Sequence, residues 1–345
     1  MNNLPISPDN VLPIPAPIGL LEFLIILTFI MHILFVNLTI SLSAGAVGLE
    51  ITGRIKNNSL LDKMAQSCSF HASVHKSIAV VLGVAPLLII SVIYTQYFYS
   101  STILIGKMWL NVIVLLIIAF LLLYVYKFMW GKWQEKKVLH ISVGFVAMLI
   151  LLFIPLIFIV NITSMIYPER WIDVRGFFAS LFYYPEIWQR YLHFILASLA
   201  SGGFYMFLYY SYKSWKGNNL KDYEQTLKLF GAKVAFWVTV LQLVAGFILL
   251  FSFKTDVRIL FLGEDLLLTT LLVLSIVLTI VLCIFLFLAG YKDSFKSFTV
   301  SLAIFVLIVG IMGWMRHEVR ESYLSPYLEK YPRTEQLSIQ SDDIG

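Results

Sequence analysis

Residues 18–49 read IGLLEFLIILTFIMHILFVNLTISLSAGAVGL. The run holds a single charged side chain, Glu22, and it exceeds the roughly 20 apolar residues that an α-helix needs to cross a bilayer core. It is too long for the apolar region of a secretory leader, and no basic residue precedes it. The stretch therefore predicts a membrane-spanning helix that remains in the mature protein.

The composition of the whole chain indicates the same class of protein. Hydrophobic residues make up 59% of the 345 residues and charged residues only 13%, whereas soluble domains are roughly half apolar and a quarter charged. Cys68 and Cys283 form no CxxC pair, which excludes a covalent haem site of the CxxCH type and an iron–sulfur spacing. We therefore expect an all-α, polytopic membrane helix bundle.

Apolar runs of spanning length occur eight times along the chain. The expected spans are about 17–49, 71–98, 103–127, 138–165, 186–212, 226–252, 264–290 and 296–318. No connection between them is long enough to hold a soluble catalytic domain. The order divides the chain into an N-terminal tail, two groups of helices and a polar C-terminal tail, at 1–16, 17–212, 213–318 and 319–345.

Lysine and arginine concentrate in alternate connections. Those after the first, third, fifth and seventh spans are the basic ones, with Arg54, Lys56, Lys63, Lys127, Lys132, Lys136, Lys137, Lys213, Lys216, Lys221, Lys228, Lys292 and Lys296. Because basic loops stay in the cytoplasm, both termini are expected outside. The net charge of +5 then reflects membrane orientation and not nucleic-acid binding.

Histidines inside the apolar runs are the first candidates for function, because an ionisable side chain is costly there unless something uses it. His32 lies halfway along the first span, and His193 lies two turns into the fifth. His71 and His75 open the second span and His140 opens the fourth, near the cytoplasmic side. For these three, interfacial side chains that reach water are the simpler interpretation. Ligation of a further haem, or relay of quinone protons, is the alternative.

Two of these histidines stand in motifs shared with a known family. The stretch from His32, HILFVNLT, resembles the first helix of subunit I of the cytochrome bd quinol oxidases, in which a His precedes Leu-Phe-Val, any residue and Leu-Thr. Residues 191–198, YLHFILAS, with GGF at 202–204, are similar to the fifth helix of that family. The resemblance implies that His32 and His193 each ligate a b-type haem. Small residues after each histidine suit a porphyrin held between helices.

Two looser similarities add candidate residues. Asn161, with Met165 and Pro168 after it, resembles the motif that closes the fourth helix of the family. Gly313-Trp314 with Glu318 resembles a Gly-Trp…Glu stretch near a late helix end. The resemblance implies that Asn161 and Glu318 lie near a cofactor. Guanidinium groups near the outer side of His193 are expected to pair with haem propionates, and these belong to Arg170, Arg175, Arg190 and Arg258.

The chain departs from the family where the family handles oxygen and quinol. Neither 94–99 nor 103–107 contains the carboxylates of the oxygen site. The segment 233–237 lacks the methionine that faces the low-spin haem, and the connection 254–263 is shorter than the quinol-binding loop of the family. Because carboxylates commonly deliver the protons that oxygen reduction consumes, efficient oxygen reduction is not expected.

The pattern favours a b-type cytochrome subunit of a prokaryotic cytoplasmic membrane, part of a quinol-linked oxidoreductase complex. It would carry two or more b haems, mainly within 17–212, and pass electrons between the quinone pool and an outer-face c-type cytochrome or other redox subunit. One alternative is a divergent bd-type quinol:oxygen oxidoreductase, with acids supplied by Glu22, Glu318 or another chain. A second alternative is a transporter or structural membrane subunit without haem.

Overall fold

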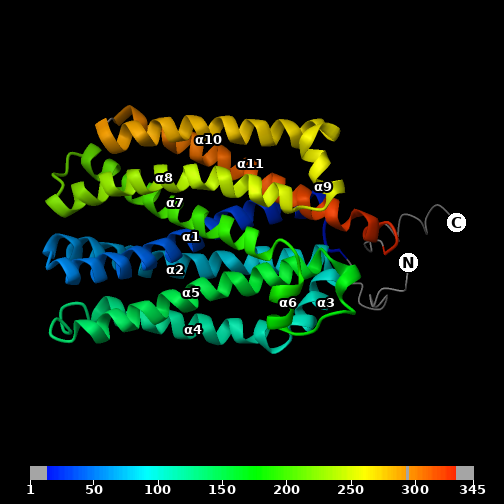
Figure 1. The fold of residues 1–345 in the computed structure, drawn as a ribbon, viewed down its shortest axis with the longest axis horizontal. Coiled ribbons are helices and arrows are strands. Elements are labelled where there is room, and N and C mark those ends of the chain that lie inside the picture. Colours follow the sequence, from blue (N-terminus) through cyan, green and yellow to red (C-terminus); the bar gives the residue numbers. More distant parts are fainter. Residues whose placement is uncertain (1–13, 293–294, 332–345) are drawn as a thin grey trace.

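The computed structural model describes residues 14–292 and 295–331, and every regular element among them is a helix. Eight helices are long and apolar enough to cross a membrane: α1 (Ile18–Lys56), α2 (Ser59–Ile93), α4 (Lys107–Phe128), α5 (Lys137–Met165), α7 (Ile187–Trp215), α8 (Asp222–Ser252), α10 (Leu266–Lys292) and α11 (Phe295–Leu328). They lie side by side along the long axis of the molecule (Figure 1). The prediction of an all-α, polytopic helix bundle is confirmed.

Consecutive spans run in opposite directions, so the connections fall into two groups. The connections 57–58, 129–136 and 216–221 lie at one end, which we name the inner end after its basic residues. The short helices lie at the opposite, outer end, where the described chain also begins and ends (Figure 1); they are α3 (Thr95–Ile105), α6 (Phe177–Tyr183) and α9 (Thr255–Ile259). The outside location of the termini stays a prediction. Most of the two predicted tails, 1–13 and 332–345, lies outside the described residues.

The second span differs from its predicted range of 71–98. The helix α2 begins at Ser59, because the side chain of Asn58 accepts a hydrogen bond from the Leu60 N–H at 2.9 Å and caps the helix. It ends at Ile93, and the next residues form the separate helix α3. Gly106 separates α3 from α4 with a φ of +62°, a conformation that glycine adopts at little cost. The polar start of α2 had hidden its first three turns from the hydropathy pattern.

The last span also extends beyond its prediction, because α11 continues through Leu328 instead of ending at residue 318. The predicted end of the span at residue 318 is therefore too early, and the first part of the predicted polar tail is helical up to Leu328. Val319, Tyr323 and Leu324 are buried at helical spacing, so one face of the extension packs against the outer end. Charged residues on the other faces of α11 lower the hydropathy of this segment, so the buried stripe of apolar residues was not visible in the hydropathy pattern.

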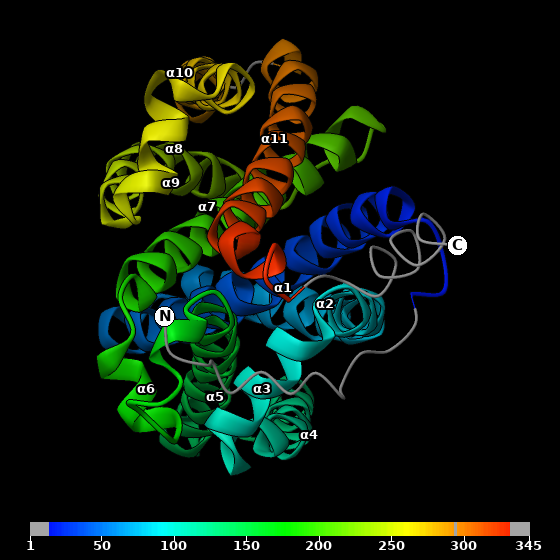
Figure 2. The ribbon, with the colours of Figure 1, turned by 90° about the vertical axis from the view of Figure 1, so that its right-hand side faces the viewer.

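The helix α7 lies in the middle of the bundle and packs against α1 and α8 (Figure 2). A Cβ atom on Gly202 would lie 1.9 Å from the Ser41 hydroxyl oxygen of α1. A Cβ atom on Gly203 would lie 2.6 Å from the carbonyl oxygen of Gly231 in α8. Glycines at both crossings thus allow backbones to approach closely, which is how helices commonly associate inside membranes.

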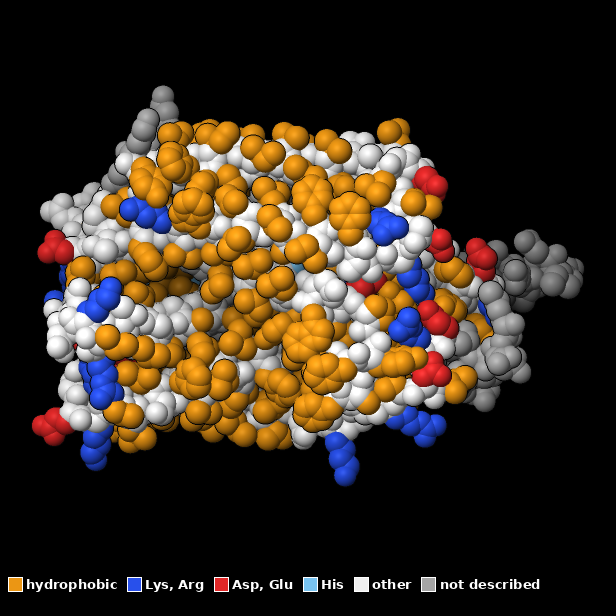
Figure 3. Space-filling view, viewed as in Figure 1, with side chains coloured by type: hydrophobic (Ala, Val, Ile, Leu, Met, Phe, Trp, Pro, Cys, Tyr) orange, Lys and Arg blue, Asp and Glu red, His pale blue; other side chains and the backbone are white. Residues whose placement is uncertain are grey.

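Hydrophobic side chains cover the middle of the face seen in Figure 3, and most of its Lys, Arg, Asp and Glu side chains gather toward the two ends. A bilayer imposes this distribution, because charged groups are costly in its core. Together with the eight spans, it makes the chain an integral membrane protein.

Candidate functional site

His32 is half-buried at mid-length of α1 and faces α2. Its Nδ1 lies 2.9 Å from the Ala79 carbonyl oxygen. Because a carbonyl oxygen only accepts, Nδ1 carries a proton, and in the neutral ring Nε2 then keeps its lone pair. Histidines that ligate metals are commonly oriented by a hydrogen bond of this kind from the second ring nitrogen.

Gly83 gives the His32 ring its place against α2. A Cβ atom at this position would lie 2.7 Å from Cε1 of the imidazole, which is closer than two such atoms can approach. Sequence reasoning missed Gly83, because the register between α1 and α2 is not visible in either helix alone. The glycine is as much a part of the His32 site as the Ala79 carbonyl.

We expect Gly83→Ala to push the His32 imidazole off its hydrogen bond to Ala79. Overpacking of this kind costs about 1–3 kcal/mol, and any group bound at Nε2 would shift with the ring. Thermal unfolding and the absorption spectrum of the purified variant test this. Gly48→Ala is the control, since a Cβ atom there meets nothing within 4 Å. Identical behaviour of the two variants would contradict the role given to Gly83.

His193 faces α8, the neighbour of α7. Its Nε2 lies 2.9 Å from the side-chain nitrogen of Gln242, and a Cβ atom on Gly246 would lie 3.7 Å from Cε1. The Nδ1 of His193 and the amide oxygen of Gln242 are buried and have no hydrogen-bond partner among the described residues. The residue opposite His193 is therefore Gln242, about one and a half turns beyond the segment 233–237 in which sequence reasoning sought it.

His71 and His75 are buried in α2, so the interpretation of them as solvated helix starts is wrong. The hydroxyl group of Tyr205 in α7 lies 3.0 Å from His71 Nδ1. The two imidazole rings are stacked with their centres 6.4 Å apart. Neither ring nitrogen of His75 has a hydrogen-bond partner within the described part of the chain.

His140 is also buried, which contradicts the interpretation that its side chain reaches water. Its Nδ1 lies 2.8 Å from a carboxylate oxygen of Glu50, and its Nε2 lies 2.8 Å from the Tyr126 carbonyl oxygen. The Tyr126 hydroxyl group donates to the other Glu50 oxygen at 2.7 Å. Both ring nitrogens are thus engaged, so this geometry argues against His140 as a haem ligand and links α1, α4 and α5.

The remaining predicted residues lie in different surroundings. Asn161 is fully buried in α5, and neither atom of its amide has a hydrogen-bond partner among the described residues. Glu318 is half-buried and accepts a hydrogen bond from Trp314. The guanidinium group of Arg258, in α9, donates a hydrogen bond to the Phe251 carbonyl oxygen near the end of α8 at 3.4 Å. These roles stay predictions, with the unsatisfied amide of Asn161 the most suggestive observation.

Carboxylates gather where α1, α2 and α11 meet at the outer end. Tyr94, which follows α2, donates a hydrogen bond to Glu321 of α11. Ligand atoms of Glu22, His317 and Glu321 lie within 4.8 Å of one another. Although residues 94–99 contain no acid, α11 supplies one to this end of α2. Sequence reasoning missed this acid because it lies far along the chain.

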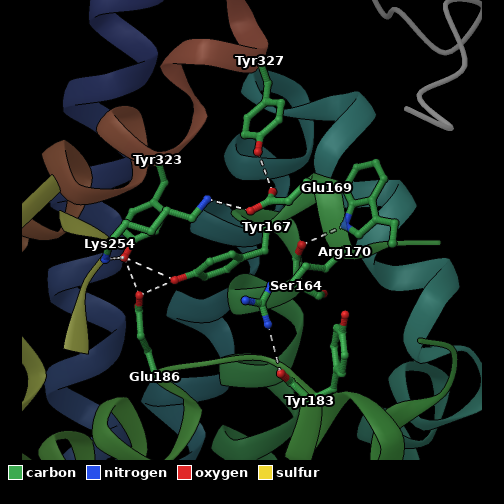
Figure 4. A network of polar contacts seen from close by, with 10 residues as sticks. Ser164, Tyr167, Glu169, Arg170, Tyr183, Glu186, Lys254, Tyr323 and Tyr327 are labelled. Atoms are coloured by element: carbon green, nitrogen blue, oxygen red, sulfur yellow. Dashed lines mark hydrogen bonds and ion pairs between the residues drawn. The ribbon is translucent and has the colours of Figure 1, made fainter. Parts of the chain in front are cut away.

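A second polar network ties the outer end together (Figure 4). Glu186 is only 3% exposed and has a positive φ of 68°. Its carboxylate accepts hydrogen bonds from Tyr167 at 2.5 Å, from Tyr323, and twice from Arg190 at 2.5 and 3.0 Å. Burial and the adjacent carboxylate raise the pKa of Tyr167, so its hydroxyl group remains a donor. Arg190, expected to pair with a propionate, is bound to Glu186 in this structure.

The same network extends to Glu169, outside the spans. Lys254 and Tyr327 donate to its carboxylate at 2.7 and 2.5 Å. Burial alone would raise the pKa of Glu169, but these two hydrogen bonds, a backbone hydrogen bond and the charge of Lys254 together hold that pKa below its ordinary value. The network therefore joins the loop after α5, the start of α7, the start of α9 and the end of α11.

No family model matches the sequence, and no curated protein does. Among solved structures, the chain is similar to that of the bd oxidase from Geobacillus thermodenitrificans, with a TM-score of 0.71 and 14% sequence identity. The match covers 91% of this chain and 89% of that chain. At this identity, the similarity shows that the chain has the bd-oxidase fold.

Proposed function

We propose that the chain is a b-type cytochrome subunit that passes electrons between the quinone pool and a redox partner at its outer end, such as a c-type cytochrome. The observation that carries the proposal is the state of His32. Its Nδ1 is held by the Ala79 carbonyl oxygen near the middle of α1, which leaves Nε2 of the neutral ring as the atom that could bind a metal. The bd-oxidase fold, together with an imidazole that a backbone hydrogen bond orients inside the bundle, supports haem binding.

The residues around His32 fit a haem ligand. Ala79 sets the tautomer, Gly83 gives the ring room, and Nε2 is the atom that would meet iron. The fit at His193 is less complete, because the Gln242 amide now lies at the atom that would bind the metal. A haem there requires the Gln242 side chain to turn away, and the unpaired atoms of this pair reduce the cost of doing so.

A bound b haem would supply one-electron transfer, and the chain supplies its surroundings. Our proposal includes two or more b haems, a prokaryotic cytoplasmic membrane and outside termini. Asn161, Arg258 and Glu318 remain the proposed contacts to cofactor. The unpaired buried amide of Asn161 supports such a contact, because an unsatisfied polar group in a core costs about 1–3 kcal/mol.

A divergent bd-type quinol:oxygen oxidoreductase is the second candidate. The cluster of Glu22, His317 and Glu321 beside Tyr94 favours it, because carboxylates there could deliver protons to a reacting group. The α11 acids thus lie beside Tyr94, the first residue of the segment 94–107, which itself contains no acid. The two candidates differ in what the reduced protein does with oxygen.

We expect the purified chain, reduced and then exposed to oxygen without a partner, to reoxidise slowly. Because residues 94–99 and 103–107 lack the carboxylates of the family's oxygen site, the rate should fall about a hundredfold or more below that of electron exchange with quinol. Stopped-flow absorption at the haem bands measures the first rate, and reduction by a quinol measures the second. Rapid, cyanide-insensitive oxygen consumption with quinol would instead support the oxidase.

A further inference from the structure

A polar stripe runs along α2 toward the site of His32. Ser67, His71 and His75 recur every four residues, and Ala79 continues the same spacing. They therefore share one face of the helix, about 6 Å apart along its axis. The stripe begins in the inner half of α2 and ends at the residue whose carbonyl group holds His32.

Tyrosines of α7 connect with this stripe. The Tyr210 and Ser67 hydroxyl oxygens are 2.6 Å apart, and the Tyr205 hydroxyl oxygen is 3.0 Å from His71 Nδ1. The Tyr205 ring packs edge-on against His75, with the ring centres 4.6 Å apart. Hydrogen-bonding groups thus alternate between the two helices from Ser67 to His75.

The inner end of the stripe meets an acid. Tyr210 interacts electrostatically with Glu224, which lies at the start of α8 and is buried. Lys213 donates to the Glu224 carboxylate at 2.7 Å, and the side chain of Lys213 is partly exposed. The other end of the stripe reaches Phe35, whose ring centre is 5.6 Å from that of His75. Since Phe35 lies one turn from His32, the stripe extends to mid-bundle.

We propose that Ser67, His71, Tyr205 and His75 form a proton relay from the inner end of the bundle to the neighbourhood of His32. Packing alone does not explain the stripe, because a buried imidazole without a partner costs about 1–3 kcal/mol. Ionisable residues inside a membrane bundle commonly mark proton paths. His75, with both nitrogens unpaired, is the group that a water molecule on such a path would satisfy.

The transfer conserves protons at each step and moves no electrons. A proton that reaches His71 Nε2 from the side of Ser67 makes that ring a cation. The cation then releases its Nδ1 proton to the Tyr205 oxygen while the proton of that hydroxyl group moves through one water molecule to one ring nitrogen of His75. His71 and Tyr205 end neutral, and His75 returns to neutral when it releases a proton from its other ring nitrogen at the end near His32. The relay itself does not depend on the proposed function. Only its use, to supply protons to quinone or oxygen chemistry, rests on that function.

The relay is tested by hydrogen exchange at His75, which needs no cofactor. Full-length protein labelled with ¹⁵N-histidine is placed in phosphatidylcholine vesicles and transferred to D2O, and loss of the imidazole N–H signals is followed by solid-state NMR. His75→Gln identifies the His75 signal. We expect fast exchange in the unaltered protein and about tenfold slower exchange in Tyr205→Phe, which keeps the ring but removes the hydroxyl group.

Tyr209→Phe is the matched control, because the Tyr209 ring also contacts His71 but its hydroxyl group is no part of the relay. Exchange at His75 should be unchanged in it. Slow exchange in the unaltered protein, or equal exchange in Tyr205→Phe and Tyr209→Phe, would overturn the proposal. Reduced-minus-oxidised spectra of the same samples test the proposed function separately, so the two failures are distinguishable.

Discussion

His32→Ala and His193→Ala are each expected to remove one b-type component from the reduced-minus-oxidised spectrum. With two haems, each variant should lose about half of its haem, because neither site offers a second imidazole in its place. His75→Gln serves as the histidine control and should keep both components. The measurement is the haem-to-protein ratio of purified variants together with the difference spectrum.

Each outcome bears on a particular residue. An unchanged haem-to-protein ratio in His193→Ala would remove His193 as a ligand and leave the contact with Gln242 as a structural hydrogen bond. An unchanged ratio in His32→Ala would remove His32 as a ligand and leave its hydrogen bond to Ala79 as a purely structural contact. Loss of haem in His75→Gln would assign that histidine to a haem and contradict the relay.

Glu186→Ala is expected to destabilise the protein most among single substitutions in the outer-end network. The change leaves Arg190 and the hydroxyl groups of Tyr167 and Tyr323 without their shared acceptor. Removing one partner of a buried ion pair costs about 3–5 kcal/mol, because the remaining charge is buried without compensation. Thermal unfolding in detergent, followed by circular dichroism, measures the loss.

Glu169→Ala is the matched control for this network. Its ion pair with Lys254 is partly exposed, so its loss should cost about 1 kcal/mol or less. Equal unfolding temperatures for Glu186→Ala and Glu169→Ala would contradict the view that Glu186 holds the outer ends of α5, α7 and α11 together.

Local pattern predicted much of the fold. The number and order of the spans could be read from hydropathy because each long apolar run must bury its backbone as a helix in lipid. The position of His32 within the first spanning helix also followed from the run 18–49. Hydropathy misplaced the boundaries at which polar residues begin or end a helix. It placed the start of α2 too late, since the helix begins at Ser59, and the end of α11 too early, since the helix continues to Leu328.

The partners of the candidate residues could not be predicted in the same way. Contact between His32 and Gly83, between His193 and Gln242, and between Tyr94 and Glu321 depends on how helices rotate and slide against one another. A single helix carries no signal for that register. Similarly, the aromatic surroundings of His71 come from α7, so its burial was invisible from the polar start of α2.

The haem content of the purified, full-length chain tests the central claim most directly. Conversion of bound haem to its pyridine complex identifies the haem type, and its ratio to protein gives the number per chain. We predict b-type haem at about two per chain, with two resolvable components in the reduced-minus-oxidised spectrum. A chain that folds in the membrane yet binds no haem would contradict the account and favour a transporter or structural subunit.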